Sequence, residues 1–237
     1  MRVKALRRAR VPVGLAGTVG VAAAALAGCF DVHSVDPGPV VLDDFESHDN
    51  RMPADPDFSI WSCGKYNPPT NEGVSCDYAM PGYDSDYSFS LQAEVTDDRD
   101  LRMDHAGAAL VTHVVGDPVD MTRFETVTFA AKVVSGNPPL PSQAQLLVEL
   151  FCKNAKTEDG TRSDELRVDQ VAAFKNDWLV VPLEMRNFTT LTSSTHIKGG
   201  TLACLKQVDS VRFAVNAELE DGGSARFTLW IDNITFQ

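Results

Sequence analysis

The amino-acid sequence predicts an all-β protein, built as an antiparallel sandwich of two sheets. Apolar and polar residues alternate with a period of two along most of the chain, which is typical of half-buried strands. Clusters of Gly, Pro, Asn and Asp separate these runs, for example at 116–118 and 136–139. No stretch carries the apolar stripe of a long amphipathic helix. This combination is typical of β-sandwiches and barrels.

The alternating segments define the individual strands. Strands are predicted at 39–46, 58–66, 87–95, 107–115, 124–134, 144–153, 165–174, 178–185, 208–219 and 225–236, and a single helical turn around 183–190. This number of strands exceeds that of an immunoglobulin domain, and the Cys–Trp–Cys spacing of that fold is absent. A jelly roll is therefore favoured over an immunoglobulin-like sandwich.

The last predicted strand contains a break in its alternation. Phe227, Leu229 and Ile231 share one face, but the apolar pattern resumes at Ile234 and Phe236, one residue out of register. Because a slip of one residue moves every following side chain to the other face, the strand needs an extra residue there. The sequence therefore predicts a β-bulge at Asp232 and Asn233, the two positions between the runs.

The N-terminus has the order of a secretory signal, with a basic segment 1–10 followed by an apolar stretch 11–28. The stretch is close to the minimum length of a membrane-spanning helix, so a retained anchor is the alternative. It ends in "LAGC", residues 26–29, which resembles the bacterial lipobox. That resemblance implies cleavage before Cys29 and lipidation of its thiol, and stable anchoring needs two or more acyl chains. Ordinary cleavage nearby, with Cys29 left as a free thiol, is the other interpretation.

These boundaries divide the chain into three parts. Residues 1–28 are expected to be a removed signal peptide, 29–38 a lipidated tether, and 39–237 one globular domain. The product would be anchored in a bacterial cell envelope. Phe30 follows Cys29, where enteric bacteria place an Asp to retain lipoproteins in the inner membrane. The outer membrane or cell surface is therefore the expected location.

With Cys29 lipidated, four of the five cysteines remain for disulfides in an oxidising compartment. Cys63 and Cys76 flank one loop, whereas Cys152 ends a predicted strand and Cys204 precedes another. We therefore expect the pairs Cys63–Cys76 and Cys152–Cys204. A zinc site is not expected, because no CxxC motif and no pair of histidines at ligand spacing is present.

The charge of the chain restricts its partners. The sequence carries 33 acidic and 21 basic residues, a formal net charge of −12 at pH 7, and five of the basic residues lie within the first 28. A surface this acidic repels nucleic-acid phosphates and anionic headgroups, so no nucleic-acid partner is expected. An acidic surface also has a simpler interpretation, which is solubility alone.

Three segments together resemble the galactose-binding-like jelly-roll family, especially its carbohydrate-binding modules. They are "VLDDFES" at 41–47, "DWLVVPLEMRNF" at 177–188 and "FTLWIDNITF" at 227–236. The resemblance implies a non-catalytic domain that binds a glycan. It also implies a structural Ca²⁺ ion with Asp44, Glu46 and Asp232 as ligands, together with backbone carbonyls. The alternative is that these carboxylates are solvated or cap a turn. A weaker acidic segment, 84–86, is a second candidate for Ca²⁺.

Aromatic residues gather between positions 61 and 87, which include all four tyrosines and one tryptophan. Aromatic rings pack against the C–H faces of sugars. Tyr66, Tyr78 and Tyr83 are therefore predicted to bind the glycan, on a loop stiffened by the Cys63–Cys76 bridge, and the alternative is that they are ordinary loop residues. The remaining rings of this segment, and the strand residues Trp178 and Trp230, are assigned to the core.

No catalytic motif appears in the sequence: GxSxG, HExxH and a phosphate-binding glycine loop are all absent. We therefore expect a binding protein and not an enzyme. Two alternatives remain open, namely a structural or protein-binding lipoprotein that uses the same fold, and a glycan hydrolase with an unrecognised site.

Overall fold

The computed structural model describes residues 39–46, 61–67, 69–70, 72–96, 106–153, 155–157, 160, 166–190, 197–220 and 222–237. Every described residue belongs to one compact unit, Pro37–Gln237. The expected signal peptide, Cys29 and the tether lie outside the described residues. Within the described part of the chain, no helix is long and apolar enough to cross a membrane.

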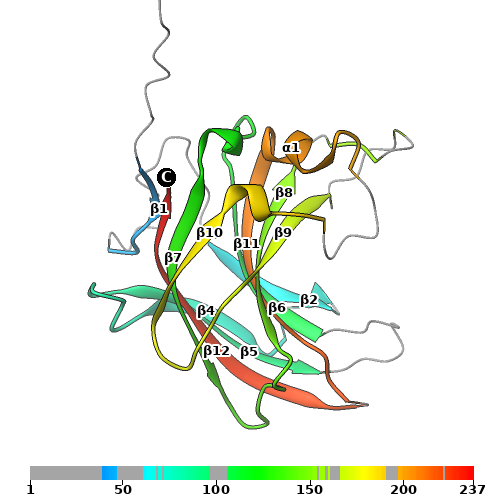
Figure 1. Ribbon diagram of the computed structural model, residues 1–237. Helices are drawn as coiled ribbons and strands as arrows, with labels where there is room; N and C mark the ends of the chain where they lie inside the picture. Colours follow the sequence, from blue (N-terminus) through cyan, green and yellow to red (C-terminus); the bar gives the residue numbers. More distant parts are fainter. Residues whose placement is uncertain are drawn as a thin grey trace, which may run out of the picture. The chain divides into compact units, whose positions relative to one another are not determined.

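The first sheet contains both terminal strands of the domain (Figure 1). Its strands follow the order β10 (Leu179–Glu184), β7 (Thr126–Ser135), β12 (Ser224–Phe236), β5 (Ser88–Thr96) and β4 (Val74–Ala79), and β1 (Val40–Asp43) pairs with the end of β12.

The second sheet packs against the first. Its strands follow the order β3 (Pro69–Thr70), β2 (Ser62–Asn67), β6 (Ala106–His113), β11 (Val208–Ala217), β8 (Gln145–Cys152) and β9 (Arg167–Ala172). All pairs in both sheets are antiparallel, and the chain passes repeatedly from one sheet to the other. The predicted class, an antiparallel two-sheet jelly-roll sandwich, is confirmed.

The core lies between the two sheets and is formed by the alternating apolar residues. Phe129 of β7 and Phe213 of β11 meet across the sandwich with ring centroids 4.9 Å apart. Trp61, just before β2, lies 6.0 Å from Phe213 and 5.9 Å from Phe45, centroid to centroid. Because the sheets touch through large aromatic side chains, burial of apolar area is the main stabilising term of the fold.

The predicted bulge in the last strand is present. Asp232 lies opposite Ala130 and Thr235 lies opposite Thr128, so β12 has one residue more than its partner in this interval. Asn233 takes a positive φ of 51°, which Asn adopts more readily than most residues. The shift in register explains how Ile231 and Ile234, three positions apart, can both be fully buried.

The structure also contains elements that the sequence did not predict. Strand β4 lies in the segment treated as a loop, because its alternation is short and is bounded by Gly73 and Pro81. Helix α1 (Gly200–Leu205) is too short to show a helical period. The expected helical turn is present as the 3₁₀ turn η3 (Met185–Asn187).

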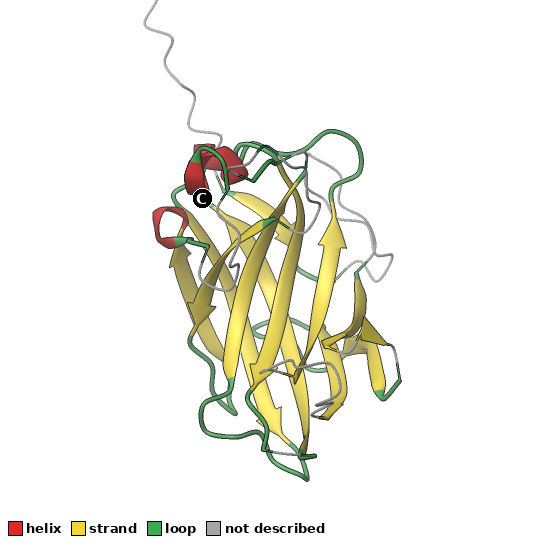
Figure 2. Cartoon of the chain, turned by 90° about the vertical axis from the view of Figure 1, so that its right-hand side faces the viewer, coloured by secondary structure: helices red, strands yellow, loops and turns green. Residues whose placement is uncertain are grey.

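The remaining 3₁₀ turn, η2 (Met121–Arg123), precedes β7. The short helical segments lie near the end of the sandwich where the C-terminus lies (Figure 2). There the carbonyl of Gln237 accepts hydrogen bonds from the backbone N–H groups of Glu125 and Thr126. These bonds fasten the last residue of the chain to the start of β7.

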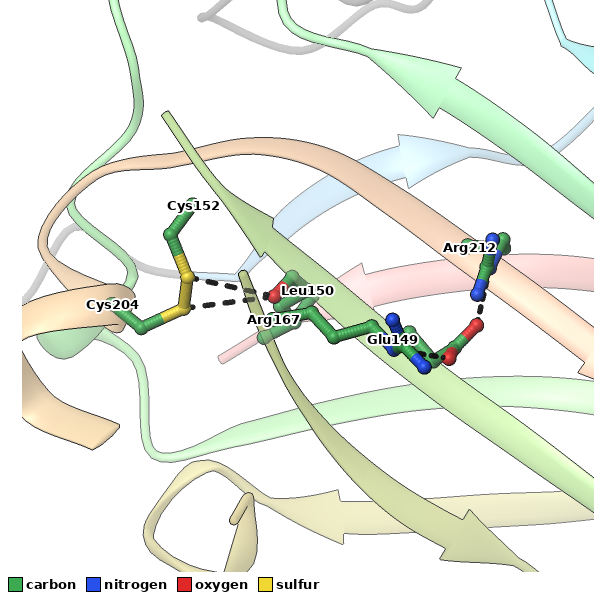
Figure 3. Close-up of polar contacts among 6 residues, drawn as sticks. All are labelled: Glu149, Leu150, Cys152, Arg167, Cys204 and Arg212. Atoms are coloured by element: carbon green, nitrogen blue, oxygen red, sulfur yellow. Dashed lines mark hydrogen bonds and ion pairs between the residues drawn. A yellow bond between two sulfur atoms is a disulfide. The ribbon is translucent and has the colours of Figure 1, made fainter. Parts of the chain in front are cut away.

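The structure joins the cysteines in the expected pairs. Cys63 of β2 is bonded to Cys76 of β4, so this bridge connects the two sheets. Cys152, the last residue of β8, is bonded to Cys204 in α1, with both sulfur atoms near the carbonyl of Leu150 (Figure 3). The second bridge therefore attaches the helix to the second sheet.

Candidate functional site

The outer side of the first sheet carries an unusual row of residues. Trp230 of β12 lies opposite Lys132 of β7 on one side and Ser90 of β5 on the other, and Ser90 lies opposite Asp77 of β4. Leu179, the first residue of β10, lies opposite Ala131, which places Trp178 at the height of Lys132. Because side chains alternate between faces, these residues point away from the core. The row crosses the sheet from β10 to β4.

Aromatic rings and one cation come together at the β10 end of this row. The ammonium nitrogen of Lys132 lies 4.8 Å from the ring centroid of Trp230. The ring of Trp178 lies 6.1 Å from that of Tyr83, centroid to centroid, with an angle of 58° between the planes. All four side chains are half-buried. We call the set Tyr83, Lys132, Trp178 and Trp230 the aromatic face.

Tyr83 reaches this position from the loop 80–87, which Asp232 holds against the sheet. The Oδ2 atom of Asp232 accepts hydrogen bonds from the backbone N–H of Tyr83 at 2.7 Å and from the hydroxyl of Ser85 at 2.6 Å. In return, the side-chain amide of Asn233 donates to the carbonyl of Tyr83 at 2.9 Å. The bulge therefore aims the polar side chains of two consecutive residues at one loop.

Two further features fix the loop. The Oε1 atom of Glu46 accepts a hydrogen bond from the backbone N–H of Tyr87 at 2.9 Å. Gly82 is buried, and a Cβ atom added to it would lie 2.0 Å from the Ser85 hydroxyl and 2.6 Å from Oδ2 of Asp232. A side chain at position 82 would therefore push the loop off the carboxylate that holds it.

Beside the aromatic face lies a polar depression of about 320 Å³. Thr228, Gln92 and Ser75 lie opposite one another on three neighbouring strands. Each lies two residues along its strand from the row that contains Trp230. The guanidinium of Arg226 pairs with the carboxylate of Glu94 at 2.8 Å at its margin. The complete lining is Gly73, Ser75, Gln92, Ala93, Glu94, Gly136, Arg226, Phe227 and Thr228. Hydroxyl, amide and charged groups there can donate and accept hydrogen bonds.

The three tyrosines predicted to bind a ligand lie in different environments. Tyr83 belongs to the aromatic face. Tyr78 instead packs at the edge of the core, with its ring centroid 5.3 Å from Phe89 and 6.5 Å from Phe45. The backbone of Tyr66 is in β2, and its side chain lies outside the described part of the structure. Tyr78 therefore does not join Tyr83 on one platform, because β4 is a strand whose alternation turns position 78 inward.

The assignment of Trp178 and Trp230 to the core was wrong. Trp230 is out of phase with the buried Leu229 and Ile231, and Trp178 is out of phase with the buried Val181 and Leu183. The period-two rule alone places both indoles on the outer side. Large apolar residues are usually buried, and that tendency outweighed the alternation in the prediction.

The carboxylates predicted to bind calcium serve as hydrogen-bond acceptors within the chain. Asp232 accepts from Tyr83, Ser85 and its neighbour Asn233, Glu46 accepts from Tyr87, and the Oδ1 atom of Asp44 accepts from the N–H of Glu46 at 3.2 Å. Among the residues that the structure describes, no three His, Cys, Asp or Glu side chains are close enough to hold a metal ion. This arrangement does not form a calcium ligand set, so calcium binding stays a prediction.

Asp43, the neighbour of Asp44, is a buried carboxylate that the sequence analysis did not single out. It accepts hydrogen bonds from the indole N–H of Trp61 and the backbone N–H of Phe45, both at 2.8 Å. Burial raises the pKa of Asp43 to about 6, and burial also raises the pKa of Asp232 against the hydrogen bonds that lower it. Both carboxylates are enclosed by donors from the chain itself, which favours a structural role over a hydrolytic one.

A second polar cluster lies on the outer side of the second sheet (Figure 3). Glu149 of β8 is buried and forms ion pairs with Arg167 of β9, at 2.8 Å, and with Arg212 of β11. The guanidinium of Arg212 also lies 4.6 Å from the ring centroid of Phe151. Here one buried carboxylate is paired with two arginines of the neighbouring strands, which is the pattern of a structural network.

The role of Asp232 can be tested by substitution. Asp232→Ala removes the acceptor for three donors, and unpaired donors in a buried place are costly, so we expect a loss of about 2–4 kcal/mol in the free energy of unfolding. The matched control is Asp117→Ala, which removes an exposed carboxylate. Urea denaturation measures both. A loss below about 0.5 kcal/mol for Asp232→Ala would show that the carboxylate does not hold the loop.

The calcium prediction has its own measurement. If Asp44 and Glu46 turn to bind Ca²⁺ together with Asp232, millimolar CaCl₂ raises the melting temperature relative to a chelator, because the ion binds only the folded state. The paired variant Asp44→Asn/Glu46→Gln should then lose this rise, and Mg²⁺ is the control cation. Identical melting curves with CaCl₂ and with chelator would contradict calcium binding.

No protein-family model matches this chain, and no curated protein matches its sequence significantly. Among solved structures, a family 11 carbohydrate-binding module of the cellulase Lic26A-Cel5E of Clostridium thermocellum is 16% identical, with a TM-score of 0.47 over 84% of this chain and 94% of the module. The same values describe a family 11 module from Clostridium thermocellum in complex with a β-1,3-1,4-mixed-linked tetrasaccharide. A family 28 module specific for non-crystalline cellulose is 11% identical, with a TM-score of 0.35 over 71% of this chain and 88% of the module. Likenesses this distant identify no ligand for the chain.

Proposed function

We propose that this domain binds a carbohydrate, and that the aromatic face together with the polar depression beside it forms the binding surface. The observation that carries the proposal is the placement of Trp178, Trp230 and Tyr83 on the outer side of a sheet. Packing of the core does not require aromatic rings there, because the buried residues of the same strands already fill the interior. Half-exposed rings gathered on one face mark a place for a partner.

The chemistry of the surface matches a sugar. Pyranose rings present C–H groups that pack against aromatic faces, and the indole N–H and phenol O–H can bond to hydroxyl groups. The side chains of Ser75, Gln92 and Thr228 supply further donors and acceptors in the adjacent depression. Because Asp232 already fixes the loop that carries Tyr83, little conformational entropy is lost when a ligand binds.

A protein-binding lipoprotein is the second candidate function. A docking surface for protein would favour a continuous apolar patch, whereas this face mixes rings with Lys132 and with hydroxyl and amide groups. A hydrolase is the third candidate, and the enclosed carboxylates of Asp43 and Asp232 do not favour it. We therefore propose a non-catalytic role.

We further propose that the protein is attached to a bacterial membrane through Cys29. The support comes from the sequence, in which a basic and apolar leader ends in "LAGC". Lipidation of the Cys29 thiol would also leave an even number of cysteines, and the other four form two disulfides. A membrane anchor would hold the sugar-binding surface at the cell envelope.

Binding is tested with the full-length protein in detergent on an array of neutral and acidic glycans. We expect retention of at least one glycan class, and an affinity at least about tenfold lower for Trp230→Ala and for Trp178→Ala, the range of hot-spot residues. Phe151→Leu is the control, because it changes an aromatic residue on the outer side of the other sheet. Equal losses in Phe151→Leu, or no glycan bound at all, would overturn the proposal and favour a protein partner.

Lipidation is tested by expression in a bacterial host with a labelled fatty acid. The wild-type protein should carry the label and fractionate with membranes, whereas Cys29→Ser should be unlabelled and leave the membrane fraction. Cys204→Ser, which removes a disulfide cysteine outside the leader, serves as the control and should keep the label. Equal membrane association of the wild-type and Cys29→Ser proteins, without label, would show that the apolar leader is retained as the anchor.

A further inference from the structure

Lys132 is the member of the aromatic face whose charge a neutral sugar would not require. It lies in the middle of β7, directly opposite Trp230 of β12, with its ammonium nitrogen 4.8 Å from the centroid of that ring. Trp178 lies on its other side, just before the first residue of β10. The cation is therefore placed between two indoles on the outer side of the sheet.

The ammonium group of Lys132 has no acidic partner among the residues that the structure describes. Four arginines of the same part of the chain do have acidic partners, since Arg226 pairs with Glu94, Arg186 with Glu184, and Arg167 and Arg212 with Glu149. The chain carries 33 acidic residues against 21 basic ones, so carboxylates are abundant. What sets Lys132 apart is its place, because its ammonium group is half-buried beside two aromatic rings and can pair there with an anionic group of a ligand.

The ammonium group of Lys132 in this position favours an anionic ligand. An ammonium group offers three hydrogen-bond donors and no acceptor, which suits a carboxylate or sulfate better than a hydroxyl group that must also donate. The partial exclusion of water by the indoles strengthens such a pair. The overall negative charge of the chain repels an anionic polymer, but screening at physiological salt limits this repulsion to about 8 Å, so that the short-range pair with Lys132 is retained.

We propose that the aromatic face recognises an acidic glycan, in which the anionic group of one sugar pairs with Lys132 while rings of the chain pack on Trp178 and Trp230. The two tryptophans are two strands apart, which corresponds to about 10 Å across the sheet. That separation accommodates consecutive sugars with the acidic one between the indoles. The inference rests on the proposed function and names the class of its ligand.

The test compares ligands that differ in charge, with the full-length protein in detergent and isothermal titration calorimetry. The probes are polygalacturonate, its fully methyl-esterified form and dextran sulfate, with cello-oligosaccharides as a neutral arm. We expect wild-type protein to bind polygalacturonate or dextran sulfate at least tenfold more tightly than the methyl ester. Preference for dextran sulfate would identify sulfate as the anionic group and would support the inference equally.

Three variants make the test specific to the charge. Lys132→Met keeps an unbranched apolar stem without the charge and should weaken binding of the acidic probe at least tenfold, whereas Lys132→Arg should stay within about threefold of the wild type. Lys198→Met, which removes an exposed lysine before α1, should leave binding unchanged. Melting curves should confirm that all three variants are folded, since the side chain of Lys132 contributes no ion pair to the described structure.

The outcomes separate this inference from the proposed function. Binding of cello-oligosaccharides or the methyl ester that is lost in Trp230→Ala but unchanged in Lys132→Met would overturn the acidic ligand and keep the carbohydrate-binding surface. Equal effects of Lys132→Met and Lys198→Met would also overturn it, because non-specific charge would then explain the binding. Absence of binding to every probe would overturn both proposals.

Discussion

The loop that completes the aromatic face depends on one carboxylate. Asp232 stands at the bulge of the last strand, where the extra residue directs its side chain toward the loop and not along the sheet. Two donors of that loop converge on its Oδ2 atom, and Gly82 leaves the room that this approach needs. Because a buried carboxylate without donors is very unfavourable, the loop and the bulge stabilise each other. The position of Tyr83 beside Trp178 follows from this contact.

This dependence connects the two ends of the described chain to the aromatic face. Strand β1 pairs with the end of β12, and Glu46, just beyond β1, holds the N–H of Tyr87. Two of the three residues that the family resemblance implies as calcium ligands, Glu46 and Asp232, are therefore residues that hold the loop. A function in ion binding and a function in positioning a loop need the same chemistry, namely carboxylate oxygens at a junction of strands.

Much of the fold could be predicted because the alternation of apolar and polar residues shows which side chains of a strand are buried. The slip between Ile231 and Ile234 indicated the bulge, and the cysteine positions indicated the pairs. Strand β4 was missed, because a short strand between glycine and proline has the composition of a loop. In the site, Trp178 and Trp230 were wrongly assigned to the core, although both alternate with the buried residues of their strands. What the sequence could not show is which outward-facing residues become neighbours, since Lys132 meets Trp230 only through the register of β7 and β12.

The central claim is that the outer side of the first sheet binds the glycan, and the three tryptophans provide a direct measurement. In ¹H–¹⁵N spectra each indole N–H gives its own signal, and that of Trp61 is fixed by its hydrogen bond to Asp43 inside the core. During titration with an oligogalacturonate, or with a cello-oligosaccharide as the neutral counterpart, the signals of Trp178 and Trp230 should shift together while that of Trp61 stays in place. Saturable binding that leaves the signals of Trp178 and Trp230 unmoved would contradict this account.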